Sequence, residues 1–225
     1  MEKLIFDCDG VLVDSEVIAE ATLVERLSTW LPDVDVQARL GEALGLTTGA
    51  ILERLASLSR HALPGDALGA IDREIERRLA LELCAIEGAA EAIERLGMSM
   101  AVVSNSHRRR VRNSLAHTGL DSLLGEVPIF CAEQVAHPKP DPGVYRLAAE
   151  TLASLPRECL VVEDSLAGVT AARAAGMTVI GFIGASHVPP GQADRLLDAG
   201  AWRVMTHMQE LPVLVMTWRK QRLAG

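Results

Sequence analysis

The sequence lacks the features that mark membrane, disulfide-rich and nucleic-acid-binding proteins. None of its apolar runs approaches the roughly 20 residues that a membrane-spanning helix needs. The four cysteines (Cys8, Cys84, Cys131 and Cys159) are far apart and form no Cys-x-x-Cys pair, so we expect reduced, buried thiols and neither a disulfide framework nor a zinc site. A net charge of −8 disfavours binding to a nucleic acid backbone. We therefore expect a cytoplasmic protein with no membrane and no nucleic-acid partner.

Hydrophobic residues are abundant, at 49% of the 225 residues, which is enough for a full core in one domain or in one domain with an insert. Short apolar runs bounded by turn residues predict strands at 4–6, 100–104, 129–131, 160–163, 179–182 and 203–205. Helix-like stretches lie between them, at 87–96, 107–117, 142–154, 166–175 and 189–199. This alternation is typical of an α/β fold in which helices cover both faces of a parallel sheet. The stretch 218–222 is expected to be a frayed, solvated helix end.

The segment 15–83 contains no convincing strand, and we predict four helices in it, at 16–30, 35–44, 48–60 and 66–83. Its position after the first strand predicts a helical cap (15–83) inserted into a core domain formed by 1–14 and 84–225. Ligands of open parallel sheets bind beyond the carboxyl ends of the strands, where the strand order switches. The cap is therefore expected to cover the site. A glycine-bracketed turn at 45–49 is either a plain interhelical turn or a loop that reads the substrate.

Two carboxylates, those of Asp7 and Asp9, follow the first strand. Side chains two residues apart in an extended chain point to the same side, and Gly10 then allows a turn that a side chain would hinder. One carboxylate can act as a nucleophile while the other, in a different environment, handles protons. Acidic residues also end strands without any catalytic role. The apolar run before Asp7 and the Gly-Val-Leu-Val-Asp-Ser run after Asp9 favour the catalytic interpretation.

Ser104, Asn105 and Ser106 follow the second core strand. A hydroxyl next to the N–H groups of a helix start can bind phosphate oxygens. The alternative is a helix N-cap, a position that Ser and Asn both favour. In register with the other motifs, these three residues and Gly10 are predicted to bind phosphate.

Lys139 is one of only three lysines and lies between two prolines, which restrict where its side chain can point. A cation there could balance a nucleophile and a transferred phosphoryl group. The alternative is an exposed loop lysine; the rarity of lysine and the spacing favour a catalytic role.

Glu163 and Asp164 end the apolar strand at 160–163. Together with Asp7 and Asp9 they form a set of hard oxygen ligands, which suits Mg²⁺ because this ion keeps several waters and takes only a few protein carboxylates. The alternative is a pair of helix-start acids favoured by the helix dipole.

In this order and spacing, the motifs resemble those of the haloacid dehalogenase (HAD) superfamily, and the resemblance covers nearly the whole chain. The run Leu-Ile-Phe-Asp-Cys-Asp-Gly-Val-Leu-Val-Asp-Ser at 4–15 resembles the nucleophile motif of that family. The helical segment resembles the cap of the subgroup that contains β-phosphoglucomutase and phosphoglycolate phosphatase. The resemblance implies a Rossmann-like HAD core, in which Asp7 attacks phosphorus and forms an aspartyl phosphate. It also implies that Asp9 protonates the leaving oxygen and then activates water.

The resemblance further implies that Ser104 and the backbone of Asn105 bind the phosphoryl group, while Lys139 steadies nucleophile and phosphate. Mg²⁺ would be held by Asp7, the carbonyl of Asp9 and Asp164. Glu163 would act as a further ligand or lie behind the ligands.

Departures from relatives narrow the activity. Dehalogenases lack the aspartate that Asp9 matches, which disfavours dehalogenation. No lysine lies between Lys3 and Lys139, so the Schiff-base chemistry of phosphonatases has no candidate. Ala19 stands where β-phosphoglucomutase has a hinge histidine, and Thr48 stands near the position of its cap arginine. Both departures weaken a mutase interpretation.

We therefore expect a magnesium-dependent phosphatase that hydrolyses a small phosphomonoester, a sugar or polyol phosphate, through an aspartyl phosphate. The alternatives are a phosphosugar mutase of the same scaffold and a catalytically idle phosphosugar-binding protein. The expected partner is a small phosphorylated metabolite, and the expected state is a monomer or a weak homodimer.

Overall fold

A computed structural model describes residues 2–40 and 48–224 of the chain. The chain divides into two compact units, Met1–Ser15 with Leu83–Gly225, and Glu16–Glu82. The first unit contains the sheet, and the second consists of helices. That the helical unit serves as a cap stays a prediction.

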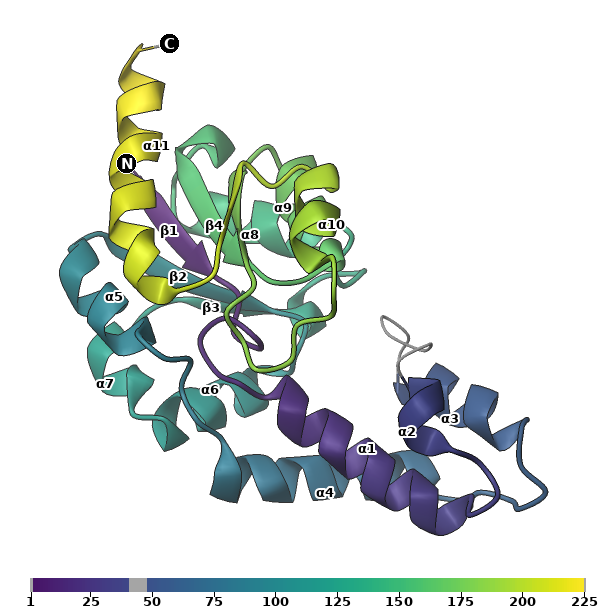
Figure 1. Ribbon diagram of the computed structural model, residues 1–225. Helices are drawn as coiled ribbons and strands as arrows, with labels where there is room; N and C mark the ends of the chain where they lie inside the picture. The colour runs from purple at the N-terminus through teal and green to yellow at the C-terminus, as the bar shows by residue number, and fades with distance from the viewer. Residues whose placement is uncertain (1, 41–47, 225) are drawn as a thin grey trace. The chain divides into compact units, whose positions relative to one another are not determined.

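The first unit is built on a six-stranded parallel sheet in the order β3-β2-β1-β4-β5-β6 (Figure 1). The strands are β1 (Lys3–Phe6), β2 (Ser99–Ser104), β3 (Ile129–Cys131), β4 (Cys159–Glu163), β5 (Thr178–Phe182) and β6 (Arg203–Met205). The register pairs Ile5 of β1 with Ala101 of β2 and with Val161 of β4. The α/β prediction is confirmed, and each predicted strand is present within one residue of its expected ends.

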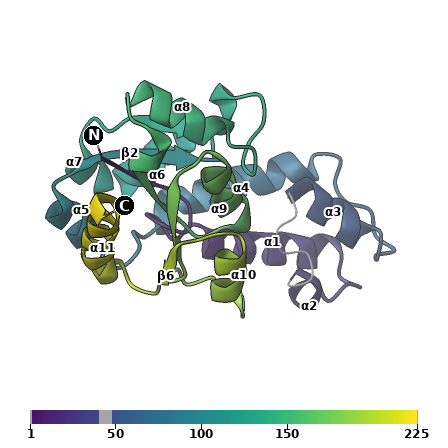
Figure 2. The ribbon, with the colours of Figure 1, turned by 90° about the horizontal axis from the view of Figure 1, so that it is seen from above.

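Helices cover both faces of this sheet, which is why its central strands are almost entirely apolar. The helices α5 (Ala89–Leu96), α6 (Arg108–His117) and α7 (Leu120–Leu124) lie on one face, and α11 (Leu211–Ala224) packs beside α5. The helices α8 (Gly143–Thr151), α9 (Leu166–Ala174) and α10 (Gln192–Asp198) lie on the other face (Figures 1 and 2). This grouping follows from right-handed crossovers that run outward from β1 in both directions. Helix α7 was not predicted, and α10 begins three residues later than expected, after Pro189 and Pro190.

The C-terminal stretch 218–222 is solvated only in part: Lys220 and Gln221 are exposed, but the stretch is held to the core by its other residues, contrary to our expectation. Trp218 is only 2% exposed, and the guanidinium of Arg222 lies 4.9 Å from the centre of its ring. Arg219 and Arg222 form ion pairs with Glu2, at 2.7 and 3.1 Å. Val215 lies three residues before Trp218 and is also buried, so an apolar stripe of helical spacing holds α11 against the core.

The second unit contains α1 (Glu16–Trp30), α2 (Val36–Leu40), α3 (Thr48–Ala56) and α4 (Ala67–Glu82). Helices α1 and α4 pack together through apolar side chains, among them Leu27, Ile71 and Ile75. The end of the predicted helix 35–44 and most of the turn at 45–49 lie outside the described residues. Within the described residues, no helix has the length and apolar character required to cross a bilayer.

Candidate active site

The predicted site residues converge at the carboxyl ends of β1, β2 and β4. From β1 the sheet extends to β2 on one side and to β4 on the other, so the strand order switches at this point. Asp7 directly follows β1, while Ser104 is the last residue of β2 and Glu163 the last residue of β4. Lys139 reaches the same place from the loop that precedes α8. All of these residues belong to the first unit.

Asp7 is held by its backbone and by one carboxylate oxygen. Its N–H donates to the carbonyl of Val162 at 2.9 Å, and its Oδ1 accepts a hydrogen bond from Lys139 Nζ at 2.6 Å. Among the described residues, no group donates to the other oxygen, Oδ2. Burial raises the pKa of Asp7 well above its usual range; Lys139 counteracts this shift, whereas Glu163 and Asp9 add to it. The carboxylate thus has one oxygen fixed by a hydrogen bond and one that accepts none from the described residues. Negative charge predominates around it.

Lys139 uses all three of its N–H donors on protein oxygens. The ammonium donates to Asp7 Oδ1 at 2.6 Å, to Glu163 Oε1 at 2.7 Å and to the carbonyl of Val103 at 3.1 Å. Burial alone would lower the pKa of Lys139, but the charges of Asp7 and Glu163 outweigh it and raise the pKa well above its usual value. Lys139 is therefore a fixed cation, and the alternative of an exposed loop lysine is wrong.

Glu163 is fully buried, and its two oxygens accept four hydrogen bonds. Oε1 accepts from Lys139 at 2.7 Å and from the hydroxyl of Tyr145 at 2.8 Å, while Oε2 accepts from the N–H and hydroxyl of Ser165 at 3.2 and 3.0 Å. A carboxylate offers about four lone-pair positions. A Cβ on residue 168 would overlap this carboxylate, so the absence of a side chain at Gly168 leaves the space that the Glu163 carboxylate occupies. Glu163 would have to give up a donor before it could bind a metal directly.

Tyr145 is the site residue that sequence reasoning missed. It lies in α8, is fully buried, and lies beneath Lys139, whose Nζ is 5.1 Å from the centre of its ring. Burial raises the pKa of Tyr145 well above its usual value, and the charge of Glu163 adds to this shift, so the hydroxyl remains a donor. A single aromatic residue on the apolar face of a helix is typical of ordinary core packing, so the sequence carries no signal for this contact.

Asp9 lies among hydroxyl groups. Ser15 donates to its Oδ1 at 2.8 Å, and Ser104 and Ser106 donate to its Oδ2 at 3.2 and 2.8 Å. The N–H of Ser106 in turn donates to the hydroxyl of Ser104 at 2.9 Å. The structure thus brings the predicted proton-transfer residue together with the two serines predicted to bind phosphate.

The side chain of Asn105 contacts the lysine loop. Its amide donates to the carbonyl of Lys139 at 3.2 Å and accepts from the N–H of Lys139 at 2.9 Å. The side chain of Asn105 thus holds the lysine loop, and its predicted phosphate contact stays a prediction for the backbone N–H.

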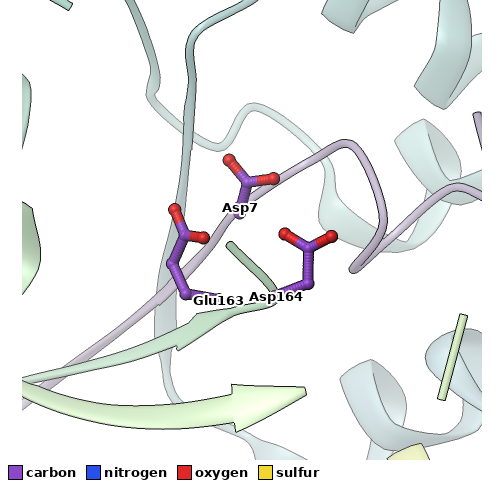
Figure 3. A group of neighbouring side chains, drawn as sticks. All are labelled: Asp7, Glu163 and Asp164. Atoms are coloured by element: carbon purple, nitrogen blue, oxygen red, sulfur yellow. The ribbon is translucent and has the colours of Figure 1, made fainter. Parts of the chain in front are cut away.

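The acidic cluster has the ligand chemistry of a divalent cation site. Asp7, Glu163 and Asp164 each offer a carboxylate oxygen, and these atoms lie within 4.8 Å of one another (Figure 3). Gly10, at φ 76°, lies so close to Asp164 that a Cβ there would overlap its carboxylate. The backbone carbonyl of Asp164 accepts a hydrogen bond from Gln192 at 2.7 Å, which fixes this turn. Hard oxygen donors of this kind fit a divalent cation, which would offset the excess of negative charge.

Known proteins resemble this chain over most of its length. A CBBY-like protein from Arabidopsis thaliana is 34% identical over 203 residues; the match covers 79% of this chain and 61% of that protein, so the chain spans about three fifths of that relative. A 6-phosphogluconate phosphatase from Escherichia coli K12 is 29% identical over 218 residues, covering 95% of this chain and 94% of that protein.

A solved structure has the same fold. It is a HAD family hydrolase from Deinococcus radiodurans with bound phosphate and sodium, at 33% identity and a TM-score of 0.83, and the match covers 97% of this chain and 96% of that one. The family model described as haloacid dehalogenase-like hydrolase matches residues 4–182. Because this match runs from the first strand through the fifth, the chain belongs to the haloacid dehalogenase-like hydrolases.

Proposed function

We propose that the protein is a magnesium-dependent phosphatase that hydrolyses a small phosphorylated sugar or polyol through an aspartyl phosphate on Asp7. The observation that carries this proposal is the asymmetry of the Asp7 carboxylate, whose Oδ1 is bound by Lys139 at 2.6 Å while Oδ2 accepts no hydrogen bond from the described residues. A nucleophile needs this combination of a fixed direction and an available lone pair. The activity named for the E. coli relative, a 6-phosphogluconate phosphatase, supports a phosphorylated sugar as substrate.

In the first step, a lone pair of Asp7 Oδ2 forms a bond to phosphorus, and the bond from phosphorus to the sugar oxygen breaks. Protonated Asp9 gives its proton to that leaving oxygen, which departs as an alcohol. In the second step, Asp9 takes a proton from water, and the water oxygen attacks phosphorus. The acyl phosphate bond breaks, and inorganic phosphate and the Asp7 carboxylate are released.

Two of the serines that donate to Asp9 would have two roles in this scheme, holding Asp9 before the substrate binds and binding phosphate afterwards. Ser104 and Ser106 donate to Asp9 Oδ2, at 3.2 and 2.8 Å. On the proposal, an incoming phosphate accepts these hydrogen bonds instead, together with the backbone N–H of Asn105. Asp9 would then be released toward the leaving oxygen.

Asp7, Asp164 and the carbonyl of Asp9 would hold Mg²⁺, and Glu163 would remain behind them as the partner of Lys139. When bound, the ion would offset negative charge on the nucleophile and on the transferred phosphoryl group. Lys139, with all its N–H groups occupied, would act on the phosphate through its charge and through the orientation of Asp7.

We also propose that the helical unit is the cap that selects the substrate. Its insertion between the first and second strands supports this role. A cytoplasmic location and a monomeric or weakly dimeric state stay predictions.

Phosphate release from a panel of phosphomonoesters, with Mg²⁺ or with EDTA, tests this proposal in the wild type and in Asp9→Asn. We expect release that needs the metal and that falls by about 10²–10⁴-fold in the variant. The control is Asp198→Asn, which makes the same chemical change at an exposed position, the last residue of α10. Equal release by wild type and Asp9→Asn would contradict the proposal.

Isomerisation of a hexose 1-phosphate in the presence of bisphosphate, with little phosphate release, would favour a mutase instead. Binding without either reaction would favour an idle binding protein.

A further inference from the structure

Tyr145, the only tyrosine of the chain, contacts both Lys139 and Glu163, which form a buried ion pair. The hydroxyl of Tyr145 donates to Glu163 Oε1 at 2.8 Å, and Lys139 Nζ lies 5.1 Å from the centre of its ring. The first contact is a hydrogen bond to a charged acceptor, and the second is a cation–π contact. A buried residue used only for packing would need neither contact.

Glu163 depends on this hydroxyl because it has no access to water. Its carboxylate is 0% exposed and receives two donors on each oxygen. A buried carboxylate is stable only when its acceptor positions are filled. Loss of the tyrosine hydroxyl would leave Lys139 as the only donor to Oε1.

Lys139 is shared between two carboxylates at nearly equal distances, 2.6 Å to Asp7 and 2.7 Å to Glu163. The hydroxyl of Tyr145 supplies part of the positive potential that Glu163 requires. Without it, Glu163 would attract the ammonium more strongly, and Lys139 would move away from Asp7. The unbonded oxygen of Asp7 would then lose its fixed direction.

We propose that Tyr145 is a positioning residue for the nucleophile: by binding Glu163, its hydroxyl keeps Lys139 in contact with Asp7. This inference rests on the proposed function, because it concerns how Asp7 is oriented for attack. It adds a residue outside the four sequence motifs to the machinery of the site.

Tyr145→Phe tests the proposal, because it removes the hydroxyl and keeps the ring in its apolar surroundings. The full-length variant is compared with wild type on a phosphomonoester that the wild type hydrolyses. We expect kcat to fall by roughly 10- to 100-fold, the usual cost of losing a hydrogen bond to a charged group, while KM stays within about twofold. A kcat within twofold of wild type, or a change confined to KM, would overturn the proposal.

Val144→Ala is the matched control. Val144 is the preceding residue of α8 and is fully buried, but its side chain has no polar group that could act on the ion pair. Truncation should lower thermal stability and leave kcat unchanged at temperatures where the protein is folded. Equal losses of kcat in Val144→Ala and Tyr145→Phe would mean that both act through packing, and would overturn the proposal.

A double-mutant cycle with Glu163→Gln identifies the route. If Tyr145 acts through Glu163, the double variant should be no slower than Glu163→Gln alone. Multiplicative losses would overturn the proposal. If Glu163→Gln does not fold, Ser165→Ala replaces it in the cycle, because the Ser165 hydroxyl binds the other oxygen of the same carboxylate. A wild type without phosphatase activity would count against the proposed function, whereas an active wild type with an equally active Tyr145→Phe would count against this inference alone.

Discussion

The side chain of Asn105 and the backbone of Lys139 form two hydrogen bonds that run in opposite directions. Asn105 donates to the carbonyl of Lys139 at 3.2 Å, and Lys139 donates from its N–H to Asn105 at 2.9 Å. The residue that follows β2 therefore fixes the loop from which the lysine reaches Asp7. The end of β2 and the two residues after it thus contain three of the phosphate-binding candidates, and one of them, Asn105, also supports the cation.

Asn105→Ala should weaken catalysis more than stability. It removes both hydrogen bonds to the lysine loop, while Lys139 Nζ keeps its three buried partners. We expect kcat to fall by about tenfold, the effect of roughly 1.4 kcal/mol in the transition state. Steady-state kinetics and thermal unfolding measure the two effects. Asn113→Ala, at an exposed position of α6, is the control and should match the wild type in both. An unchanged kcat in Asn105→Ala would contradict this role.

Lys139→Met should destabilise the fold strongly. The variant leaves Asp7 and Glu163 as buried carboxylates without their shared cation. Breaking a buried ion pair in this way costs about 3–5 kcal/mol of the free energy of unfolding. Urea unfolding measures the loss. Adding Glu163→Gln removes one of the two charges and should recover part of the stability. A double variant that is less stable than Lys139→Met would show that the charges are not the cause.

Gly168→Ala should destabilise the protein although it adds a better helix former to α9. Its Cβ would overlap the carboxylate of Glu163, which four hydrogen bonds hold in place. We expect a loss of about 1–3 kcal/mol, as for other overpacked sites. Gly49→Ala in α3 is the control: nothing lies within 4 Å of its added Cβ, so stability should rise by about 0.5–1 kcal/mol. Equal effects of the two substitutions in urea unfolding would refute this account.

Thiol labelling should distinguish the four cysteines by the rate at which each reacts. Cys84 is exposed, whereas Cys8, Cys131 and Cys159 are buried, so the expectation of buried thiols was wrong for one of four. Burial raises the pKa of Cys131 to about 11, so this thiol stays protonated at pH 8 and reacts poorly. Iodoacetamide at pH 8 should therefore modify Cys84 first in the folded protein, as read by peptide mass spectrometry, and all four cysteines in urea. Early labelling of Cys131 in the folded state would contradict the buried position.

The sheet could be predicted because buried parallel strands need near-continuous apolar runs. In β4, Leu160, Val161 and Val162 are all 0% exposed. Helix α7 could not be predicted in the same way, because its five residues between Gly119 and Gly125 are too few to show a helical period. The buried face of α11 did have a signal, since Val215 and Trp218 are spaced as on one face of a helix. The basic residues that follow Trp218 favoured a solvated helix end instead, which is why this apolar face was not predicted.

The ends of the strands indicated which residues meet, because parallel strands bring their carboxyl ends to one edge of the sheet. The sequence could not indicate how many hydrogen bonds each residue forms. Glu163 and Asp164 are adjacent acids in the sequence, yet Glu163 accepts four hydrogen bonds and is fully buried. Tyr145 contributes one of those bonds from a helix that contains none of the sequence motifs.

The most direct test of the account is the chemical state of Asp7 during turnover. The reaction is quenched with acid, the acyl phosphate is reduced with borohydride, and the peptide that contains residues 4–15 is sequenced by mass spectrometry. The account predicts a phosphorylated intermediate at Asp7, seen as reduction of that side chain to an alcohol, with Asp9 unchanged in the same peptide. Phosphate release with the label on another residue, or with no labelled residue at all, would contradict it.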